Sequence, residues 1–305
     1  MTAKTAVIFP GKGVVDHRKL TKFLMLNPAA RRRLATADDV LGYRVLDRYR
    51  PDDDHSEAAQ VAFLVACLAL ADWAEETAGI DPAVCAGPSF GQKALTTYAG
   101  MLPFSETVRL TAELARVEQD YFTEWHTDTV THCFVRVPED DFQQALADMA
   151  VDGMWYELSG VVDDGFYFVS LREPDLPWLI DRVRAAGGYS MGTMRPPVHA
   201  RSFGELRQRA STVLDGFQLS APRLPVLSDQ DGSVVETPAA ARAMLLDTFD
   251  QPINWPKVVR ALAEHGVRSL HFLGPDTLFH RVDCVRGSFE VTHIDTGTPL
   301  RPRPR

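Results

Sequence analysis

The sequence predicts an α/β protein with a mostly parallel sheet, helices on both faces of that sheet, and a smaller inserted domain. The first observation is a short apolar run at 5–9 that ends in a proline–glycine loop, as a buried strand does. The second is a similar run at 83–86, with helical patterns before and after it. Strands that alternate with helices are typical of parallel sheets covered on both faces. The third is a change of pattern near residue 129, which marks the insertion.

Helical periodicity and glycine signals define the other elements of the main domain. Ala58 to Thr77 is a long apolar-rich stretch that Gly79 closes, which indicates a helix. The remaining expected elements are helices at about 92–100, 105–123, 202–215 and 256–265 and strands at 224–227 and 269–273.

The insertion at 129–195 has the order strand, helix, strand, strand, helix, strand. This βαββαβ order is that of a ferredoxin-like module. The main domain is then discontinuous, 1–128 and 196–298, and the proline- and arginine-rich residues 299–305 form a tail that is expected to fray. Within the insertion, strands are expected at 131–137, 155–158, 166–171 and 189–194, and helices at 139–149 and 174–186.

Composition and charge exclude several classes of protein. The 305 residues are 45% hydrophobic and 24% charged, as in an ordinary globular protein. The net charge of −9 argues against general nucleic-acid binding. The four cysteines lack zinc-binding spacing and lie among apolar residues, so we expect buried free thiols in a reducing compartment. Because neither a signal peptide nor a run of roughly 18 apolar residues is present, we expect a soluble cytoplasmic protein with no membrane span. The sequence shows neither a metal-binding cluster nor a dinucleotide-binding fingerprint, so we expect no metal and no bound cofactor.

The most informative motif is Gly87-Pro88-Ser89-Phe90-Gly91, a G-x-S-x-G pattern that directly follows the strand at 83–86. Small residues around a serine let a strand turn sharply into a helix and leave the hydroxyl exposed at the turn. Such a serine can attack an ester or thioester if a histidine accepts its proton. The pattern is short, and an ordinary glycine–proline turn is the alternative.

Several motifs, taken in order, resemble one family: the malonyl-CoA:acyl-carrier-protein transacylases and the acyltransferase domains of polyketide synthases. The resemblance covers roughly residues 4–285, and it is the collinear set, rather than any single motif, that carries it. The motifs are Phe9-Pro10-Gly11-Lys12-Gly13, the elbow with Tyr98-Ala99-Gly100 behind it, Pro197-Val198-His199, Leu224-Pro225-Val226-Leu227-Ser228, Pro252-Ile253-Asn254-Trp255 and Leu273-Gly274-Pro275.

The resemblance implies an α/β-hydrolase-like core that carries out ping-pong acyl transfer. Ser89 would attack an acyl thioester with His199 as its base, and a phosphopantetheine thiol, the arm of the substrate, would then accept the acyl group. The backbone N–H groups of Lys12 and Phe90 would form the oxyanion hole. The family orients its histidine through backbone carbonyl groups, and the segment around Thr248 would supply one.

Two departures from the family bear on the acyl group. Malonyl-specific members bind the free carboxylate with an arginine, and counting without gaps puts Leu114 at that place. Leucine cannot pair with a carboxylate, although a two-residue slip would restore Arg116. Val198 replaces a phenylalanine before the histidine and should widen the acyl pocket. We therefore expect Gln60, Leu114 and Val198 to line a pocket for an acyl group bulkier than malonyl and uncharged.

Acyl carrier proteins, or the carrier domains of polyketide synthases, are the implied partners, with acyl-CoA as another donor. Carrier proteins are acidic, so an acidic enzyme needs a local basic surface to meet one. The candidates for that surface are Arg182, Arg184, Arg195 and Arg201, whereas Arg31–Arg33 are expected to be solvated.

Other functions remain compatible with these residues. One is malonyl-CoA:acyl-carrier-protein transacylase activity itself, and another is an acyl hydrolase that uses the same Ser89 and His199 to strip stalled acyl groups from carriers. Replacements at Lys12, Pro88 and Leu114 also fit a member that only docks carriers. An ordinary α/β-hydrolase fits less well, because its histidine normally follows an acidic residue late in the chain.

Overall fold

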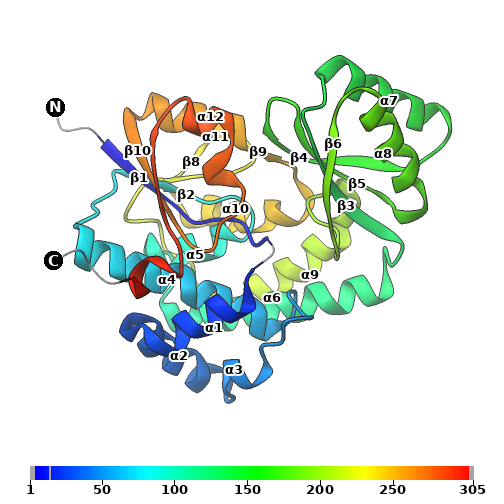
Figure 1. Ribbon diagram of the computed structural model, residues 1–305. Coiled ribbons are helices and arrows are strands. Elements are labelled where there is room, and N and C mark those ends of the chain that lie inside the picture. The colour runs from blue at the N-terminus through cyan, green and yellow to red at the C-terminus, as the bar shows by residue number, and fades with distance from the viewer. Residues whose placement is uncertain (1–3, 14, 302–305) are drawn as a thin grey trace.

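A six-stranded sheet forms the centre of the larger domain in the computed structural model, which describes residues 4–13 and 15–301 (Figure 1). Its strand order is β11-β10-β1-β2-β7-β8. Neighbouring strands pair in parallel except β7 and β8, so the prediction of a mostly parallel sheet is confirmed. The strands are β1 (Lys4–Ile8), β2 (Val84–Ala86), β7 (Val226–Leu227), β8 (Val234–Val235), β10 (Val267–Leu273) and β11 (Glu290–Ile294).

Strand β1 shows why the apolar runs are continuous rather than alternating. Val7 and Phe9 pack on one face of the sheet, and Ala6 and Ile8 pack on the other. Successive side chains of a strand point to opposite faces, and all four of these side chains are fully buried. Both faces of the sheet are therefore covered.

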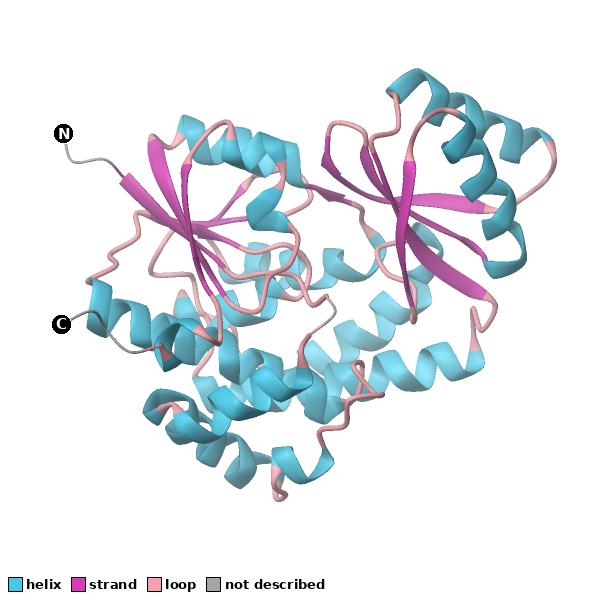
Figure 2. Cartoon of the chain, viewed as in Figure 1, coloured by secondary structure: helices cyan, strands magenta, loops and turns pink. Residues whose placement is uncertain are grey.

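Helices cover the two faces unequally (Figure 2). The larger group surrounds α4 (Glu57–Ala78), and it contains α1 (His17–Leu26), α2 (Pro28–Leu41), α3 (Val45–Arg48), α5 (Gly91–Tyr98), α6 (Phe104–Glu124), α9 (Gly204–Leu214) and α10 (Pro238–Asp250). The opposite face is covered by α11 (Trp255–Glu264) and α12 (Asp283–Arg286). The sequence analysis assigned no element to 17–48 or 238–250, which the structure shows to be helical.

Helix α4 lies at the centre of the larger helical group. Its N-terminus is capped by Ser56, whose side chain accepts from the N–H of Ala59, and it ends at Gly79 in the left-handed conformation, as predicted. An 18-residue window of α4 has a mean hydropathy of 1.5, enough by length and composition alone to cross a membrane, which the sequence analysis did not anticipate. Because 83% of that window is buried inside the fold, its apolar character is explained by core packing.

The smaller domain has the predicted βαββαβ order. It comprises β3 (Thr129–Val135), α7 (Glu139–Val151), β4 (Tyr156–Asp163), β5 (Phe166–Arg172), α8 (Leu176–Ala185) and β6 (Tyr189–Met194). Its sheet has the order β6-β3-β5-β4-β9, and its first four strands pair antiparallel. The edge strand β9 (Ile253–Asn254) belongs to the larger domain and pairs in parallel with β4. The two domains are thus joined by a shared sheet as well as by the chain.

Two further expectations need adjustment. In the predicted tail, Pro299 and Leu300 belong to a short 3-10 turn. Asp295 caps this turn by accepting from the N–H groups of Gly297 and Thr298. Residues 302–305 lie outside the described part of the chain. Three of the four free thiols are buried as expected, but Cys284 is only half-buried.

Candidate active site

The Ser89 elbow connects β2 to α5 by a sharp turn. Ser89 has φ +53°, a left-handed conformation that is unusual for a residue other than glycine. The glycines on both sides are required by close packing. A Cβ on Gly91 would lie 2.2 Å from the carbonyl oxygen of Phe9, and one on Gly87 would lie 2.8 Å from the carbonyl carbon of Gly91. The elbow thus presents its hydroxyl where strand gives way to helix.

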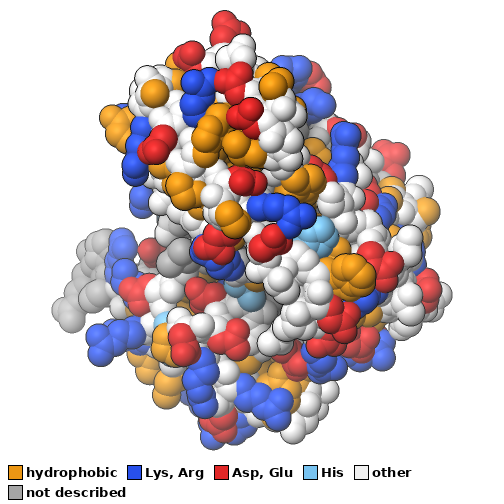
Figure 3. All heavy atoms as spheres, turned by 90° about the vertical axis from the view of Figure 1, so that its right-hand side faces the viewer, with side chains coloured by type: hydrophobic (Ala, Val, Ile, Leu, Met, Phe, Trp, Pro, Cys, Tyr) orange, Lys and Arg blue, Asp and Glu red, His pale blue; other side chains and the backbone are white. Residues whose placement is uncertain are grey.

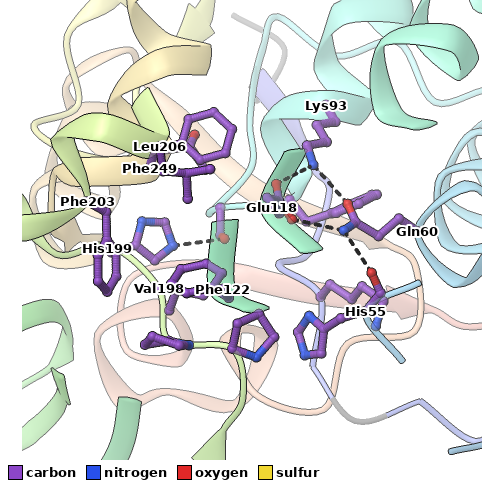
Figure 4. Close-up of a pocket in the computed structure, with 16 residues that line it drawn as sticks. His55, Gln60, Lys93, Glu118, Phe122, Val198, His199, Phe203, Leu206 and Phe249 are labelled. Atoms are coloured by element: carbon purple, nitrogen blue, oxygen red, sulfur yellow. Dashed lines mark hydrogen bonds and ion pairs between the residues drawn. The ribbon is translucent and has the colours of Figure 1, made fainter. Parts of the chain in front are cut away.

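His199 lies beside the serine hydroxyl. Its Nε2 atom is 2.9 Å from Ser89 Oγ, although 110 positions separate the two residues in the chain (Figure 4). The histidine is 2% exposed and also adopts a positive φ, +56°. Burial lowers the pKa of the ring to about 4, so at neutral pH it is uncharged and able to accept a proton.

The Thr248 hydroxyl itself makes no hydrogen bond to His199. Thr248 donates its hydroxyl proton to Gln92 Oε1 (2.5 Å) or to the carbonyl of Met244. The backbone of Gln251, just beyond the end of α10, instead faces the imidazole and raises its pKa, against the larger effect of burial. Nδ1 makes no hydrogen bond of normal geometry within the described chain. Gln251 lies three residues after Thr248, within the segment that was expected to face the histidine.

Buried hydroxyl groups of the smaller domain hold the peptide that precedes His199. The N–H of Val198 donates to Thr131 Oγ1 (2.9 Å), and the carbonyl of Val198 accepts from Ser170 Oγ (3.2 Å). Ser159 supports Ser170 at 2.6 Å, and all three hydroxyl residues are 0% exposed. The position of the imidazole thus depends on β3, β4 and β5.

Two backbone N–H groups lie close to the serine. The glycine loop packs against the elbow, since a Cβ on Gly11 would lie 3.6 Å from Ser89 Cβ. Lys12 and Phe90 both line the cavity around Ser89. Within residues 4–13 and 15–301, no protein acceptor is found for the N–H of either residue. Two free donors beside a nucleophile can bind a developing oxyanion.

The cavity around Ser89 ends in a buried polar cluster. Lys93 Nζ lies 2.9 Å from Gln60 Oε1 and 3.2 Å from Glu118 Oε1, and Gln60 Nε2 donates to Glu118 Oε2 at 2.9 Å. Gln60 and Val198 line the cavity as expected. Figure 4 shows this cluster across the cavity from His199. Sequence reasoning singled out neither Lys93 nor Glu118.

The prediction for Leu114 is wrong. Leu114 is 1% exposed, belongs to the hydrophobic core and does not line the cavity. Glu118 lies one helical turn later on the same face of α6 and takes the position at the cavity. Arg116 is directed elsewhere and pairs with Glu57 at 2.5 Å, with 54% of its side chain exposed.

Two larger cavities adjoin the one that contains Ser89. One, of about 370 Å³, extends from Ser89 and His199 between the domains, where the loops at 51–55 and 275–279 line it. The other, of about 270 Å³, lies past Glu118 and Phe122 and reaches His126 and Arg195. A substrate arm can therefore enter from one side, and an acyl chain has room to continue on the other.

The four arginines proposed to bind a carrier do not form one surface. Arg182 and Arg184 lie on α8, which covers the outer face of the smaller sheet, and they pair with Asp148 and Asp181. Neither of them lines the cavities around Ser89. Arg195 does line the mouth, where it pairs with Glu173. On the face shown in Figure 3, basic and acidic side chains are interspersed.

Arg201 is exposed and lies next to the histidine loop. Its backbone N–H and that of Ser202 donate to the carboxylate of Glu157 in β4. Within the described residues, no group of three histidine, cysteine or acidic side chains could hold a metal ion.

Comparisons with known proteins agree with this geometry. Residues 133–194 match the family model of the VinK acyltransferase small domain. The chain is 25% identical over 283 residues to the malonyl CoA-acyl carrier protein transacylase of Salmonella typhimurium, covering 88% of each, and 23% identical over 276 residues to that of Escherichia coli K12, with the same coverage.

The fold is that of solved malonyl transacylases. The structure of a type II polyketide synthase acyl-carrier protein in complex with its malonyl-transacylase (PlMCAT:AntF) matches with a TM-score of 0.85 at 21% identity, covering 98% of both chains. FabD from Acinetobacter baumannii matches with a TM-score of 0.85 at 17% identity, covering 97% and 95%. The protein is an acyltransferase. Its sequence is similar to those of malonyl CoA-acyl carrier protein transacylases, and its smaller domain is similar to the VinK small domain.

Proposed function

We propose that the protein moves an acyl group from an acyl thioester to the phosphopantetheine thiol of an acyl carrier protein, through an acyl-Ser89 intermediate, in polyketide biosynthesis. The observation that carries the proposal is the 2.9 Å contact between Ser89 Oγ and a buried, neutral His199 at the meeting point of two cavities. The names of the curated relatives, and the solved complex of a polyketide synthase acyl-carrier protein with its transacylase, support the carrier as partner.

Each half-reaction uses the same two side chains. Ser89 Oγ attacks the thioester carbonyl while His199 Nε2 accepts the hydroxyl proton. The N–H groups of Lys12 and Phe90 stabilise the oxyanion of the tetrahedral intermediate. As the C–S bond breaks, His199 returns the proton to the leaving thiolate. The carrier thiol then gives its proton to His199, attacks the acyl-serine ester, and releases Ser89 with its proton restored.

The cavity beyond Ser89 supports a cargo other than malonate. A free malonyl carboxylate would meet Glu118, and the cation beside it, Lys93, is already engaged by Glu118 and Gln60. Burying an unpaired carboxylate there is unfavourable. The adjoining cavity past Phe122 leaves room for a longer chain. We infer an acyl group without a free carboxylate, which the enzyme binds with no cofactor of its own.

Malonyl transfer is the second candidate, and two observations favour it. Curated relatives that match over 88% of the chain are named malonyl CoA-acyl carrier protein transacylases. Lys12 also lines the cavity, and burial lowers its pKa from the ordinary value while the nearby acidic groups Asp54, Glu118 and Asp53 raise it. Its ammonium group could take the place of the missing arginine.

Intact-mass measurement after exposure to thioester donors separates these functions. The protein is mixed with malonyl-CoA or with neutral acyl donors on CoA and on carrier protein, and the mass gained at Ser89 is followed before and after apo- or holo-carrier is added. The proposal predicts rapid acylation by neutral donors, slow malonylation, and discharge only onto the holo-carrier. Rapid malonylation that is lost in Lys12→Met would favour the second candidate. Release of free acid without a carrier would indicate a hydrolase.

A further inference from the structure

A buried carboxylate that the mechanism does not use lies directly beneath the nucleophile. Asp229 follows β7 in the chain and is 0% exposed. Its Oδ2 accepts the backbone N–H of Ser89 at 2.5 Å, and its Oδ1 accepts from Gln92 Nε2. Its carbonyl accepts from the N–H of Asn254 at 2.8 Å, so the residue is fixed in place on its backbone side as well.

This carboxylate is costly to bury. Its side chain accepts from neutral amides, and burial raises its pKa to about 7. Its burial is offset by the donors from which it accepts, the Ser89 N–H and the Gln92 amide, and losing it would leave both without an acceptor. Its specific contact is with the peptide of a serine at φ +53°, a left-handed conformation that is unfavourable for a residue other than glycine.

The contacts continue from Asp229 to the base. Gln92 donates to Asp229 through its amide nitrogen, and its Oε1 accepts from Thr248 Oγ1 at 2.5 Å. Thr248 lies on α10, and the backbone of Gln251 that faces His199 follows directly after this helix. A single chain of hydrogen bonds therefore links the nucleophile's peptide to the segment that orients its base.

We propose that Asp229 is a positioning residue: it holds the Ser89 peptide in its left-handed conformation and, through Gln92 and Thr248, fixes the elbow relative to the His199 side of the site. This inference rests on the proposed role of Ser89 and concerns how that serine is held, not what it carries.

Donor and acceptor complementarity makes the proposal testable by exchange. When ionised, Asp229 only accepts, whereas the Gln92 amide donates to it with one end and accepts from Thr248 with the other. Asp229→Asn puts an amide donor against either the Ser89 N–H or the Gln92 amide. Gln92→Glu puts two carboxylates face to face. The double variant restores every donor to an acceptor, because an asparagine can accept from Ser89 and donate to a glutamate, which still accepts from Thr248.

The test is the second-order rate of Ser89 labelling by a fluorophosphonate, which requires no knowledge of the acyl group. An unsatisfied buried donor predicts that each single variant labels roughly 10- to 100-fold more slowly than the wild type. The double variant should recover to within about threefold of the wild type, since its pairing is complete. Asp231→Asn, an exposed change on the same loop, is the matched control and should label at the wild-type rate.

Thermal unfolding of every variant separates positioning from folding. If Asp229→Asn does not fold, the double variant still decides, because complementarity predicts that it folds and reacts. Single variants that label like the wild type would overturn the inference, as would a folded double variant no faster than the slower single one. A wild-type protein that cannot be labelled at Ser89 would overturn the proposed function instead, and this inference with it. If the fluorophosphonate labels Ser89 at the normal rate but the thioester donors do not acylate it, only the proposed identity of the acyl group is contradicted.

Discussion

Glu118→Gln should destabilise the protein far more than the loss of an exposed ion pair does. The Lys93 side chain is 7% exposed and that of Glu118 is 20% exposed, with 3.2 Å between the charged atoms. Replacing the carboxylate with a neutral amide leaves a buried ammonium group with hydrogen-bond acceptors but without its counter-charge. Breaking a buried pair in this way costs about 3–5 kcal/mol. Because Glu118 retains some contact with water, we expect a loss of about 2–3 kcal/mol.

Thermal and urea unfolding measure this loss. At roughly 2 °C per kcal/mol for a chain of this size, the unfolding midpoint should fall by about 4–6 °C. Arg116→Gln is the matched control on the same helix, since its ion pair with Glu57 is 54% exposed on the arginine side. It should cost less than about 1 kcal/mol. Lys93→Met combined with Glu118→Gln should regain most of the stability. Equal effects of the two single changes, or no recovery in the double variant, would refute the reasoning.

Three further predictions concern the reacting groups and the elbow. Since burial lowers the pKa of His199 to about 4, and only the neutral ring accepts a proton, the labelling rate of Ser89 should fall with decreasing pH through about 4; an acid limb centred on 6.5 would contradict this. Thr131→Val keeps the shape of the side chain but removes the acceptor for the Val198 N–H, so it should slow the labelling of Ser89 about tenfold or more. Ser159→Ala is the control, because Ser159 bonds Ser170 and touches neither the N–H nor the carbonyl of Val198. Equal slowing by both changes would argue against the role of Thr131 in holding the Val198 peptide. Gly91→Ala places a Cβ 2.2 Å from a backbone oxygen, so soluble, wild-type-like protein from that variant would be inconsistent with the elbow described.

The sequence predicted the parts of the fold that depend on local periodicity. The strands at 5–9 and 83–86 and the βαββαβ order of the smaller domain were found at nearly the expected residues. Helices α1 to α3 were missed because 17–48 is rich in charge and short of long apolar runs. Signals for the helix ends were nevertheless present: Asn27 ends α1, Asn27 and Pro28 begin α2, and the left-handed Gly42 ends α2. Strand β9 is two residues long and exists only because β4 lies beside it.

Site residues could be predicted where a sequence motif determines the backbone conformation. They could not be predicted where tertiary packing determines which side chain reaches the cavity. Ser89 and His199 follow from glycine spacing and from motif order, and the structure brings them to 2.9 Å. Asp229 and Glu118 are charged residues, and from sequence alone such residues are expected to be solvated. Leu114 was assigned by counting along a helix, but residues four apart share a helix face, so which of the two reaches the cavity is decided by tertiary packing.

The central claim, that Ser89 is a nucleophile activated by His199, is tested most directly by one measurement. The protein and its His199→Ala variant are treated with a fluorophosphonate, and the modified residue and its rate of formation are determined by peptide mass analysis. We predict a single label at Ser89, formed about 10²- to 10⁴-fold more slowly without the imidazole. A label on another residue, or an unchanged rate at Ser89 in the folded variant, would contradict the account.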